Sequence, residues 1–147
     1  MEQRGRGWRR RAAFGVAAVL GALALAAGAD DEAAKSFRFT IELPRKAAAG
    51  KPAEVTVRLR PKGRYKINMD FPFKLSVTPP AGASMGKKVL TKKDAERYTE
   101  KEARLRVPFT PSIKGKLRFG AECRFAICIA EACFPRTEAL TWIVEAR

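Results

Sequence analysis

Hydrophobic and polar residues alternate along most of the chain after about residue 35. The segment 36–43, SFRFTIEL, places Phe37, Phe39, Ile41 and Leu43 on one side and mainly polar residues on the other. A period of two is the pattern of a half-buried β-strand. Further strands are predicted where related patterns occur, at residues 53–60, 65–67, 73–78, 103–109, 117–127 and 137–145.

These strands predict an all-β fold. Seven or eight short strands with turn residues between them, and no long helical period, are typical of an immunoglobulin-like antiparallel β-sandwich. A closed barrel with a similar number of strands is the alternative. The last segment, 137–145, is apolar on both faces around Trp142, which predicts a central strand. Residues 81–100 are polar and give no clear strand pattern, although Thr91 could begin one helical turn that runs through Tyr98.

The amino-terminal segment has the pattern of a secretory signal peptide. Five arginines between residues 4 and 11 precede an uncharged run of 18 residues that ends at Ala29. We expect cleavage after Ala29, which assigns residues 1–29 to the signal peptide and 30–147 to one exported domain. A retained membrane anchor is the alternative, because 18 apolar residues approach the length that spans a bilayer. Both interpretations place the domain outside the cytoplasm, in the periplasm or an equivalent compartment.

The chain is strongly basic, with 30 Lys and Arg against 15 Asp and Glu. The expected mature domain keeps a net charge of +11, since residues 1–29 hold five of the arginines and one glutamate. Many basic residues alternate with apolar ones, as in VRLR at 57–60, which favours the solvent-facing side of a sheet. A dedicated polyanion site is the alternative, and we expect no nucleic-acid partner for an exported protein.

Two of the three cysteines, Cys128 and Cys133, enclose only four residues between the last two predicted strands. Such a connection is normal for a β-hairpin, so the two cysteines are expected to face each other where the strands meet the loop. Facing residues at a non-hydrogen-bonded pair have Cα atoms about 4.5 Å apart, a distance that a disulfide accepts. Closing so short a loop stabilises a fold only modestly. Redox exchange and a structural role therefore both stay open.

The remaining chemistry of the sequence is limited. Cys123 shares its side of the strand with Phe125 and Ile127, which favours a buried thiol over a resolving cysteine. The sequence has no histidine, which excludes His-ligated zinc and Cys-His catalysis. We expect neither a metal nor a cofactor. Arg124 and Arg136 could favour a thiolate at the cysteine pair, or they could be surface charges.

Several of these features together resemble a known family. Gly63-x-Tyr65-x-Ile67, then Leu105-x-Val107-Pro-Phe, then a long strand into Cys128-x4-Cys133-x-Pro135, is similar to the amino-terminal periplasmic domains of the thiol:disulfide interchange protein DsbD. The likeness covers most of residues 36–145.

The resemblance implies an immunoglobulin-like domain in which Cys128 and Cys133 cycle between dithiol and disulfide. It implies electron transfer to or from a thioredoxin-like protein or a membrane thiol reductase, and an aromatic cap over the cysteines, for which Tyr98 is the candidate. The alternative function is a non-enzymatic envelope binding module with a structural hairpin disulfide. In both cases we expect a monomer without a membrane segment after signal cleavage.

Overall fold

The computed structural model describes residues 35–147, and these residues are mainly β-strands. One 3₁₀ turn, η1, spans Lys92–Asp94. The strands are β1 (Phe37–Glu42), β2 (Ala53–Pro61), β3 (Lys66–Ile67), β4 (Lys74–Thr78), β5 (Ala83–Ser84), β6 (Val89–Thr91), β7 (Ala95–Thr99), β8 (Glu102–Pro111), β9 (Gly115–Cys128) and β10 (Cys133–Ala146).

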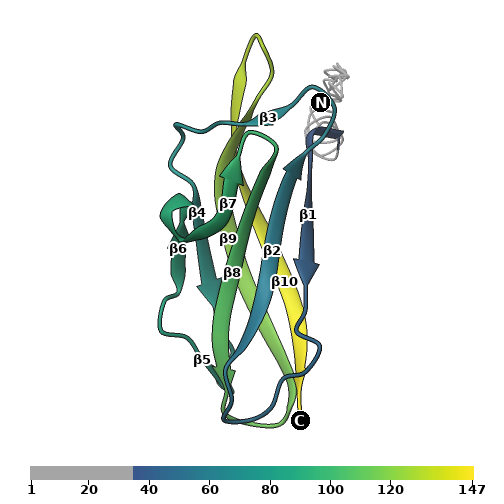
Figure 1. Cartoon of the computed structure of the whole chain (residues 1–147), viewed down its shortest axis with the longest axis vertical. Helices are drawn as coiled ribbons and strands as arrows, with labels where there is room; N and C mark the ends of the chain where they lie inside the picture. The colour runs from purple at the N-terminus through teal and green to yellow at the C-terminus, as the bar shows by residue number, and fades with distance from the viewer. Residues whose placement is uncertain (1–34) are drawn as a thin grey trace, which may run out of the picture.

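The strands form two antiparallel sheets that pack face to face (Figure 1). One sheet has the order β1-β2-β8, with β7 and the short β5 both pairing with β8. The other has the order β10-β9-β4-β6, with β3 pairing with β9. Without the two-residue strands β3 and β5, these orders match the ABED and GFCC′ sheets of immunoglobulin domains. The predicted immunoglobulin-like sandwich is therefore confirmed.

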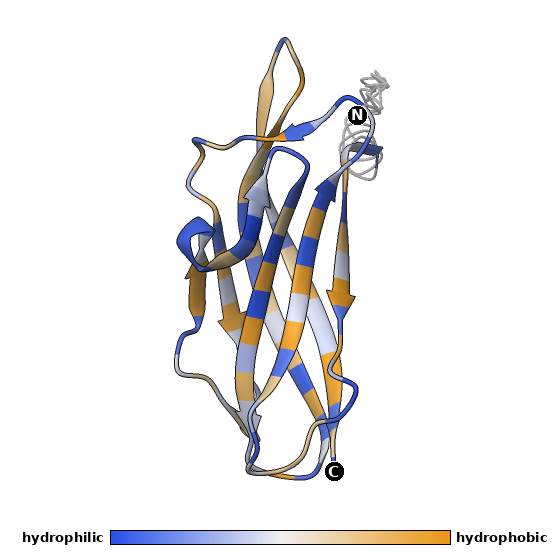
Figure 2. Ribbon diagram, viewed as in Figure 1, coloured by the Kyte–Doolittle hydropathy of each residue, from blue (hydrophilic) through white to orange (hydrophobic). Residues whose placement is uncertain are grey.

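The core lies between the two sheets and is built by alternate residues of the long strands. Figure 2 shows this alternation as successive bands along β2 and β8. Edge-to-face aromatic pairs connect the two sheets, including Phe37 with Phe125 and Phe109 with Phe119, and Trp142 stacks on Phe119 at a ring-centroid distance of 5.6 Å. Such ring pairs stabilise a core beyond the area that they bury.

The outer face of the β1-β2-β8-β7 sheet carries arginines around one buried glutamate. Glu102 is 7% exposed, and its carboxylate lies 3.0 Å from Arg104 and 3.1 Å from Arg58. Arg60 and Arg97 also lie within 4 Å of this carboxylate. Like charges on paired strands repel each other unless an opposite charge separates them. Glu102 therefore allows a basic face to form an ordered sheet surface.

The position of the last strand differs from the sequence-based expectation. We expected a central strand around Trp142, but within residues 35–147 β10 is at the edge of its sheet and pairs only with β9. Its apolar residues are divided between two environments: Trp142 and Val144 are buried in the core, whereas Ile143 is 40% exposed. An apolar residue on the outer face does not require a covering strand, because protein surfaces contain many apolar atoms.

The polar region between residues 81 and 100 is more regular than its sequence indicates. It contains β5, β6, η1 and β7, which follow one another along an outer edge of the sandwich. The sequence suggested one helical turn from Thr91 through Tyr98, but only the 3₁₀ turn η1 forms, and the residues after it belong to β7. Thr91 caps η1 by accepting a hydrogen bond from the Lys93 backbone N–H. The Asp94 carboxylate accepts a hydrogen bond from the Thr91 backbone N–H, which completes a capping box.

The expected signal peptide, residues 1–29, lies outside the described residues. Within residues 35–147, no helix has the length and apolar character needed to cross a bilayer.

Candidate functional site: the disulfide hairpin

The long strands β9 and β10 place the two clustered cysteines opposite each other. Cys128 ends β9, Cys133 begins β10, and the two residues are partners in the strand register. Their sulfur atoms form a disulfide of 2.00 Å, and their Cα atoms are 4.0 Å apart. The Ile129 N–H donates to the Ala132 carbonyl just beyond them, which makes the cysteines a closely spaced non-hydrogen-bonded pair. The predicted facing arrangement is confirmed.

This hairpin extends beyond the other strands at one end of the molecule (Figure 1). Cys128 is partly buried, whereas Cys133 is exposed to solvent. Phe134, which follows Cys133, is 38% exposed, and Met69 on a neighbouring loop is 37% exposed. The disulfide therefore lies at a projecting tip with apolar side chains beside it.

The loop between β3 and β4 supports the disulfide through Asn68. The Asn68 side-chain amide donates to the Cys133 sulfur at 3.6 Å, and its oxygen accepts the backbone N–H groups of Asp70 and Phe71. The Asn68 backbone N–H also donates to the Ala126 carbonyl on β9. One asparagine thus shapes its own loop and joins it to the hairpin.

Tyr98, the candidate aromatic cap, contacts this loop from β7. Its ring packs edge-to-face on Phe73 at 5.4 Å, and its hydroxyl donates to the Asn68 carbonyl at 3.4 Å. Burial, together with the nearby Cys123 thiol, raises the pKa of Tyr98 to about 12. Tyr98 is thus linked to the disulfide through Asn68, the residue that contacts the sulfur.

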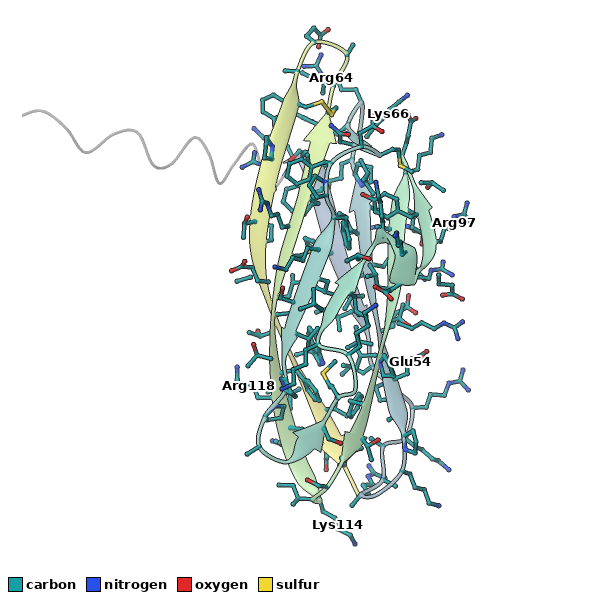
Figure 3. The ribbon with its side chains drawn as sticks, turned by 90° about the vertical axis from the view of Figure 1, so that its left-hand side faces the viewer. Glu54, Arg64, Lys66, Arg97, Lys114 and Arg118 are labelled. Carbon is teal, nitrogen blue, oxygen red and sulfur yellow. A yellow bond between two sulfur atoms is a disulfide. The ribbon has the colours of Figure 1, made fainter. Side chains whose placement is uncertain are left out.

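A hollow of about 440 Å³ lies beside Cys128, between the hairpin loop and the chain around β3. Arg64 and Lys66 line one side of it, and Glu131 lines the hairpin side. Figure 3 shows Arg64 and Lys66 at the same end of the molecule as the disulfide. Lys66 is the register partner of Cys128 and pairs with Glu100 at 3.1 Å. Lys66 and Arg64 therefore supply positive charge near a cysteine.

The two arginines that the sequence suggested lie further along the hairpin. Arg124 is four residues before Cys128 and places its guanidinium 5.6 Å from the centre of the Phe71 ring. Arg136 is three residues after Cys133, and its buried Nε has no hydrogen-bond partner among the described residues. Sequence reasoning selected these two by their proximity in the chain, and it missed Asn68, Arg64 and Lys66 because strand pairing brings these three to the hairpin.

The third cysteine is a buried thiol, as its position in the strand predicted. Cys123 is 0% exposed and unpaired, and it lies among core residues. Burial, with a smaller effect of the Glu138 carboxylate, raises the pKa of its thiol to about 12. A neutral, enclosed thiol is a poor nucleophile. Among residues 35–147, no group of three potential His, Cys, Asp or Glu ligands could hold a metal ion.

Comparisons with family models and with curated proteins found no match to this chain. Among solved structures, the fimbrial subunit AggA from Escherichia coli is 10% identical, with a TM-score of 0.41, and the match covers 76% of this chain and 94% of that one. A cohesin module of a Clostridium perfringens family 33 glycoside hydrolase is 12% identical, with a TM-score of 0.42 and coverages of 76% and 97%. At these values neither structure carries an argument about function, and the fold assignment rests on the strand order.

Proposed function

We propose that the protein is an exported immunoglobulin-like binding module that presents its disulfide-fixed hairpin to a protein partner. The observation that carries this proposal is the disulfide between register partners at a projecting tip, beside the exposed side chains of Phe134 and Met69. Aromatic residues and methionine are enriched in protein interfaces. Disulfides persist in oxidising compartments, which supports export.

In this proposal the disulfide has a structural role. An edge hairpin that extends beyond its sandwich has few neighbours, so a covalent bond across its end limits fraying of the two strands. The chain-entropy model gives about 2 kcal/mol for a loop this short. A Cys128→Ser/Cys133→Ser double variant should therefore unfold at a lower urea concentration, by about 2 kcal/mol in the free energy of unfolding, while it keeps its strand content by circular dichroism.

A second candidate is thiol:disulfide exchange, which the exposure of Cys133 and the DsbD-like sequence pattern favour. In this reaction a partner thiolate attacks one sulfur of the pair, a mixed disulfide forms, and the other cysteine leaves as a thiolate. A second partner thiol then completes the reduction. The positive charge of Arg64 and Lys66 would favour the thiolate that is released at Cys128.

The reduction potential of the pair distinguishes the two candidates. The protein is equilibrated with glutathione or dithiothreitol redox buffers, and the reduced fraction is measured by alkylation and mass spectrometry. A structural disulfide should have a midpoint below about −300 mV, whereas an exchanging pair should lie well above it. The second measurement mixes the protein in its Cys128–Cys133 disulfide form with a reduced thioredoxin that lacks its resolving cysteine, so that thiolate attack on the pair leaves a trapped mixed disulfide. A midpoint above about −300 mV, together with a trapped mixed disulfide, would contradict the binding module with a structural disulfide and support thiol:disulfide exchange.

A further inference from the structure

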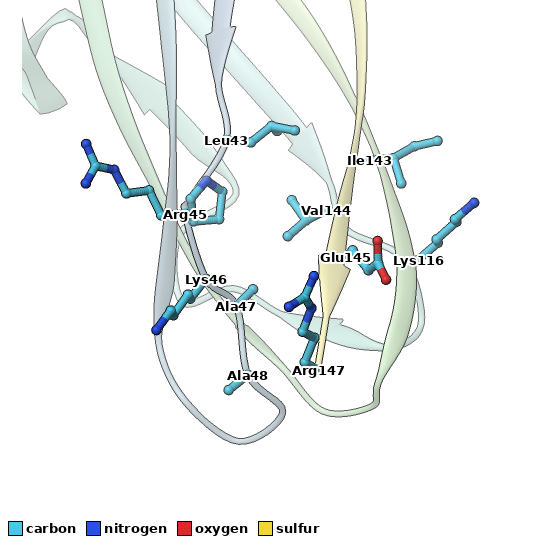
Figure 4. A pocket seen from close by; sticks show the side chains of 11 residues that line it. Leu43, Arg45, Lys46, Ala47, Ala48, Lys116, Ile143, Val144, Glu145 and Arg147 are labelled. Atoms are coloured by element: carbon cyan, nitrogen blue, oxygen red, sulfur yellow. The ribbon is translucent and has the colours of Figure 1, made fainter.

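A second hollow, drawn in Figure 4, lies beside the carboxyl end of the chain, which Figure 1 shows at the end of the molecule opposite the disulfide hairpin. It has a volume of about 580 Å³ and lies between the loop that follows β1 and the last residues of β10. Backbone hydrogen bonds fix this loop to the strand end: the Arg147 N–H donates to the Ala47 carbonyl, and the Ala49 N–H donates to the Arg147 carbonyl. We call this hollow the β1–β10 pocket.

The walls of the β1–β10 pocket are largely apolar. Ala47 and Val144 are 6% and 2% exposed and form its closed part. Leu43 and Ile143 also line it, but they are 51% and 40% exposed. These two are among the few large hydrophobic side chains that the described residues leave in contact with water. A ligand that covered them would gain roughly 25 cal/mol for each Å² of apolar surface removed from water.

The rim of the same pocket is basic. Arg45, Lys46, Lys116 and Arg147 line it, with Glu145 as the acidic residue. None of these four cations lies within ion-pair distance of a carboxylate among the described residues, whereas the arginines around Glu102 are paired. Figure 4 shows the Arg147 side chain directed back along β10, toward Glu145. A terminal carboxylate after Arg147 would still leave a net charge of +2 at the rim.

We propose that the β1–β10 pocket binds a small amphiphilic anion, an alkyl chain that ends in a carboxylate or phosphate group. The alkyl chain would cover Leu43 and Ile143, and the head group would pair with Arg147 and Lys116. The volume of the β1–β10 pocket falls in the range of small-ligand sites, which are mostly apolar with a few polar groups that fix the orientation of the ligand. A free inorganic anion would leave the apolar walls wet, and a neutral lipid would leave the four cations without a partner.

The proposal is tested by titrating the full-length ¹⁵N-labelled chain with decanoate and with decyl phosphate, each below its micelle concentration. Both probes should shift the backbone amides of Ala47, Ile143, Val144 and Arg147 in a saturable manner. Tighter binding of decyl phosphate would identify the head group as a phosphate, as in phospholipids, and tighter binding of decanoate would identify it as a fatty-acid carboxylate. Acetate and inorganic phosphate, which lack the alkyl chain, should bind at least tenfold more weakly.

Variants separate the rim charges from the general charge of the protein. Lys116→Ala/Arg147→Ala should weaken decanoate binding at least tenfold. The matched variant Arg38→Ala/Lys88→Ala loses one arginine and one lysine that do not line the pocket, so its affinity should stay within twofold. Ile143→Ser, which removes an exposed apolar wall, should also weaken binding.

Two results would overturn the proposal. One is neutral decyl maltoside binding at the same amides as tightly as decanoate, since the rim cations would then have no role. The other is decanoate shifts confined to residues outside the pocket, including the uncharged run at 12–29. Reduction of the Cys128–Cys133 disulfide should leave the decanoate affinity unchanged, so this experiment is independent of the function proposed for the hairpin.

Discussion

Glu102 shows how one residue determines whether a basic sheet surface is stable. Burial alone would raise the pKa of its carboxyl, but the hydrogen bond from Arg104 and the charges of Arg104, Arg60 and Arg58 outweigh burial and lower it. The carboxylate is therefore charged in the folded state at every pH above its lowered pKa. Its contribution to stability is present above the pKa of the unfolded chain and is lost as the pH falls through the folded value.

Glu102→Gln should destabilise the fold by roughly 1–3 kcal/mol at pH 7, because the partly buried guanidinium groups of Arg58 and Arg104 lose the anion that they share. The measurement is urea unfolding followed by Trp fluorescence. The matched control is Glu54→Gln, which removes an exposed glutamate whose pairing with Arg106 has an N–O distance of 3.6 Å. Exposed pairs contribute about 0.5 kcal/mol, so equal effects of the two substitutions would contradict a special role for Glu102.

At the scale of single residues, sequence predicted the cysteine pair well and its surroundings poorly. Cys128 and Cys133 are close in the chain, so the hairpin loop alone determines the distance between them. Asn68 is 65 residues from Cys133, and it contacts the sulfur only because β3 pairs with the end of β9. A lone asparagine two residues before an aspartate has no sequence signal other than that of a turn.

Strands that bury one face were predicted correctly, because their apolar and polar residues alternate with a period of two. The pattern located β1, β2, β8 and β9 closely, since their large apolar residues alternate with polar ones and face the core. The same pattern wrongly placed β10 at the centre of a sheet. Ile143 lines the β1–β10 pocket on the outer face of β10, and this apolar residue made the sequence appear buried on both faces. The polar edge strands β6 and β7 bury too few residues to give a pattern.

The loop from Asn68 to Phe73 contacts the hairpin sulfur through the Asn68 side-chain amide. Asn68→Ala removes both the amide that contacts the sulfur and the oxygen that accepts two backbone N–H groups. We expect the disulfide of this variant to react with dithiothreitol several-fold faster, because the loop is freed from the hairpin. The measurement is the pseudo-first-order rate of reduction under native conditions.

Asn68→Asp is the matched control for this loop. Aspartate keeps an oxygen that can accept the N–H groups of Asp70 and Phe71, but it cannot donate to the sulfur. A rate between those of the wild type and Asn68→Ala is expected if both the donor and the turn contribute. Equal rates in all three proteins would contradict a protective role for the loop.

For the whole molecule, the buried Cys123 thiol and the half-buried Tyr98 hydroxyl predict a loss of stability at alkaline pH. Their folded pKa values are about 12, above the ordinary values of 9.0 and 10.0. Below pH 9 the folded and unfolded chains hold these protons equally, so the stability from both groups is fully present there. Between pH 9 and 12 the unfolded chain releases them first. The buried Cys123 thiol then costs about 1.4 kcal/mol per pH unit between its two pKa values, and the half-buried Tyr98 hydroxyl costs less because water screens it.

The measurement is urea unfolding of the disulfide-intact protein between pH 7 and 10.5. The wild type should lose stability from about pH 9, whereas Cys123→Ala should begin to lose it nearer pH 10, where Tyr98 still contributes. The slopes with pH are compared rather than the absolute stabilities, because the alanine also leaves a small cavity. Identical slopes in the two proteins between pH 9 and 10 would contradict the buried position of the Cys123 thiol.

The architecture of the whole molecule could be predicted because it depends on the number of strands and on the turns between them. The placement of its two hollows could not, since each forms where segments distant in the chain meet. Lys66 meets Cys128 through β3–β9 pairing, and Ala47 meets Arg147 through two backbone hydrogen bonds. The expected signal peptide at residues 1–29 stays a prediction.

The strand β10 runs without interruption from the disulfide to the end that carries the β1–β10 pocket (Figure 1). A biotin or affinity tag attached after Arg147 would therefore emerge beside that pocket and about as far from the hairpin as the molecule allows. A sensor surface coated through such a tag would hold the hairpin toward the flowing solution while it hindered the opposite end. This orientation suits experiments that capture a partner of the hairpin. Measurements of amphiphile binding require a protein without a tag at its carboxyl end.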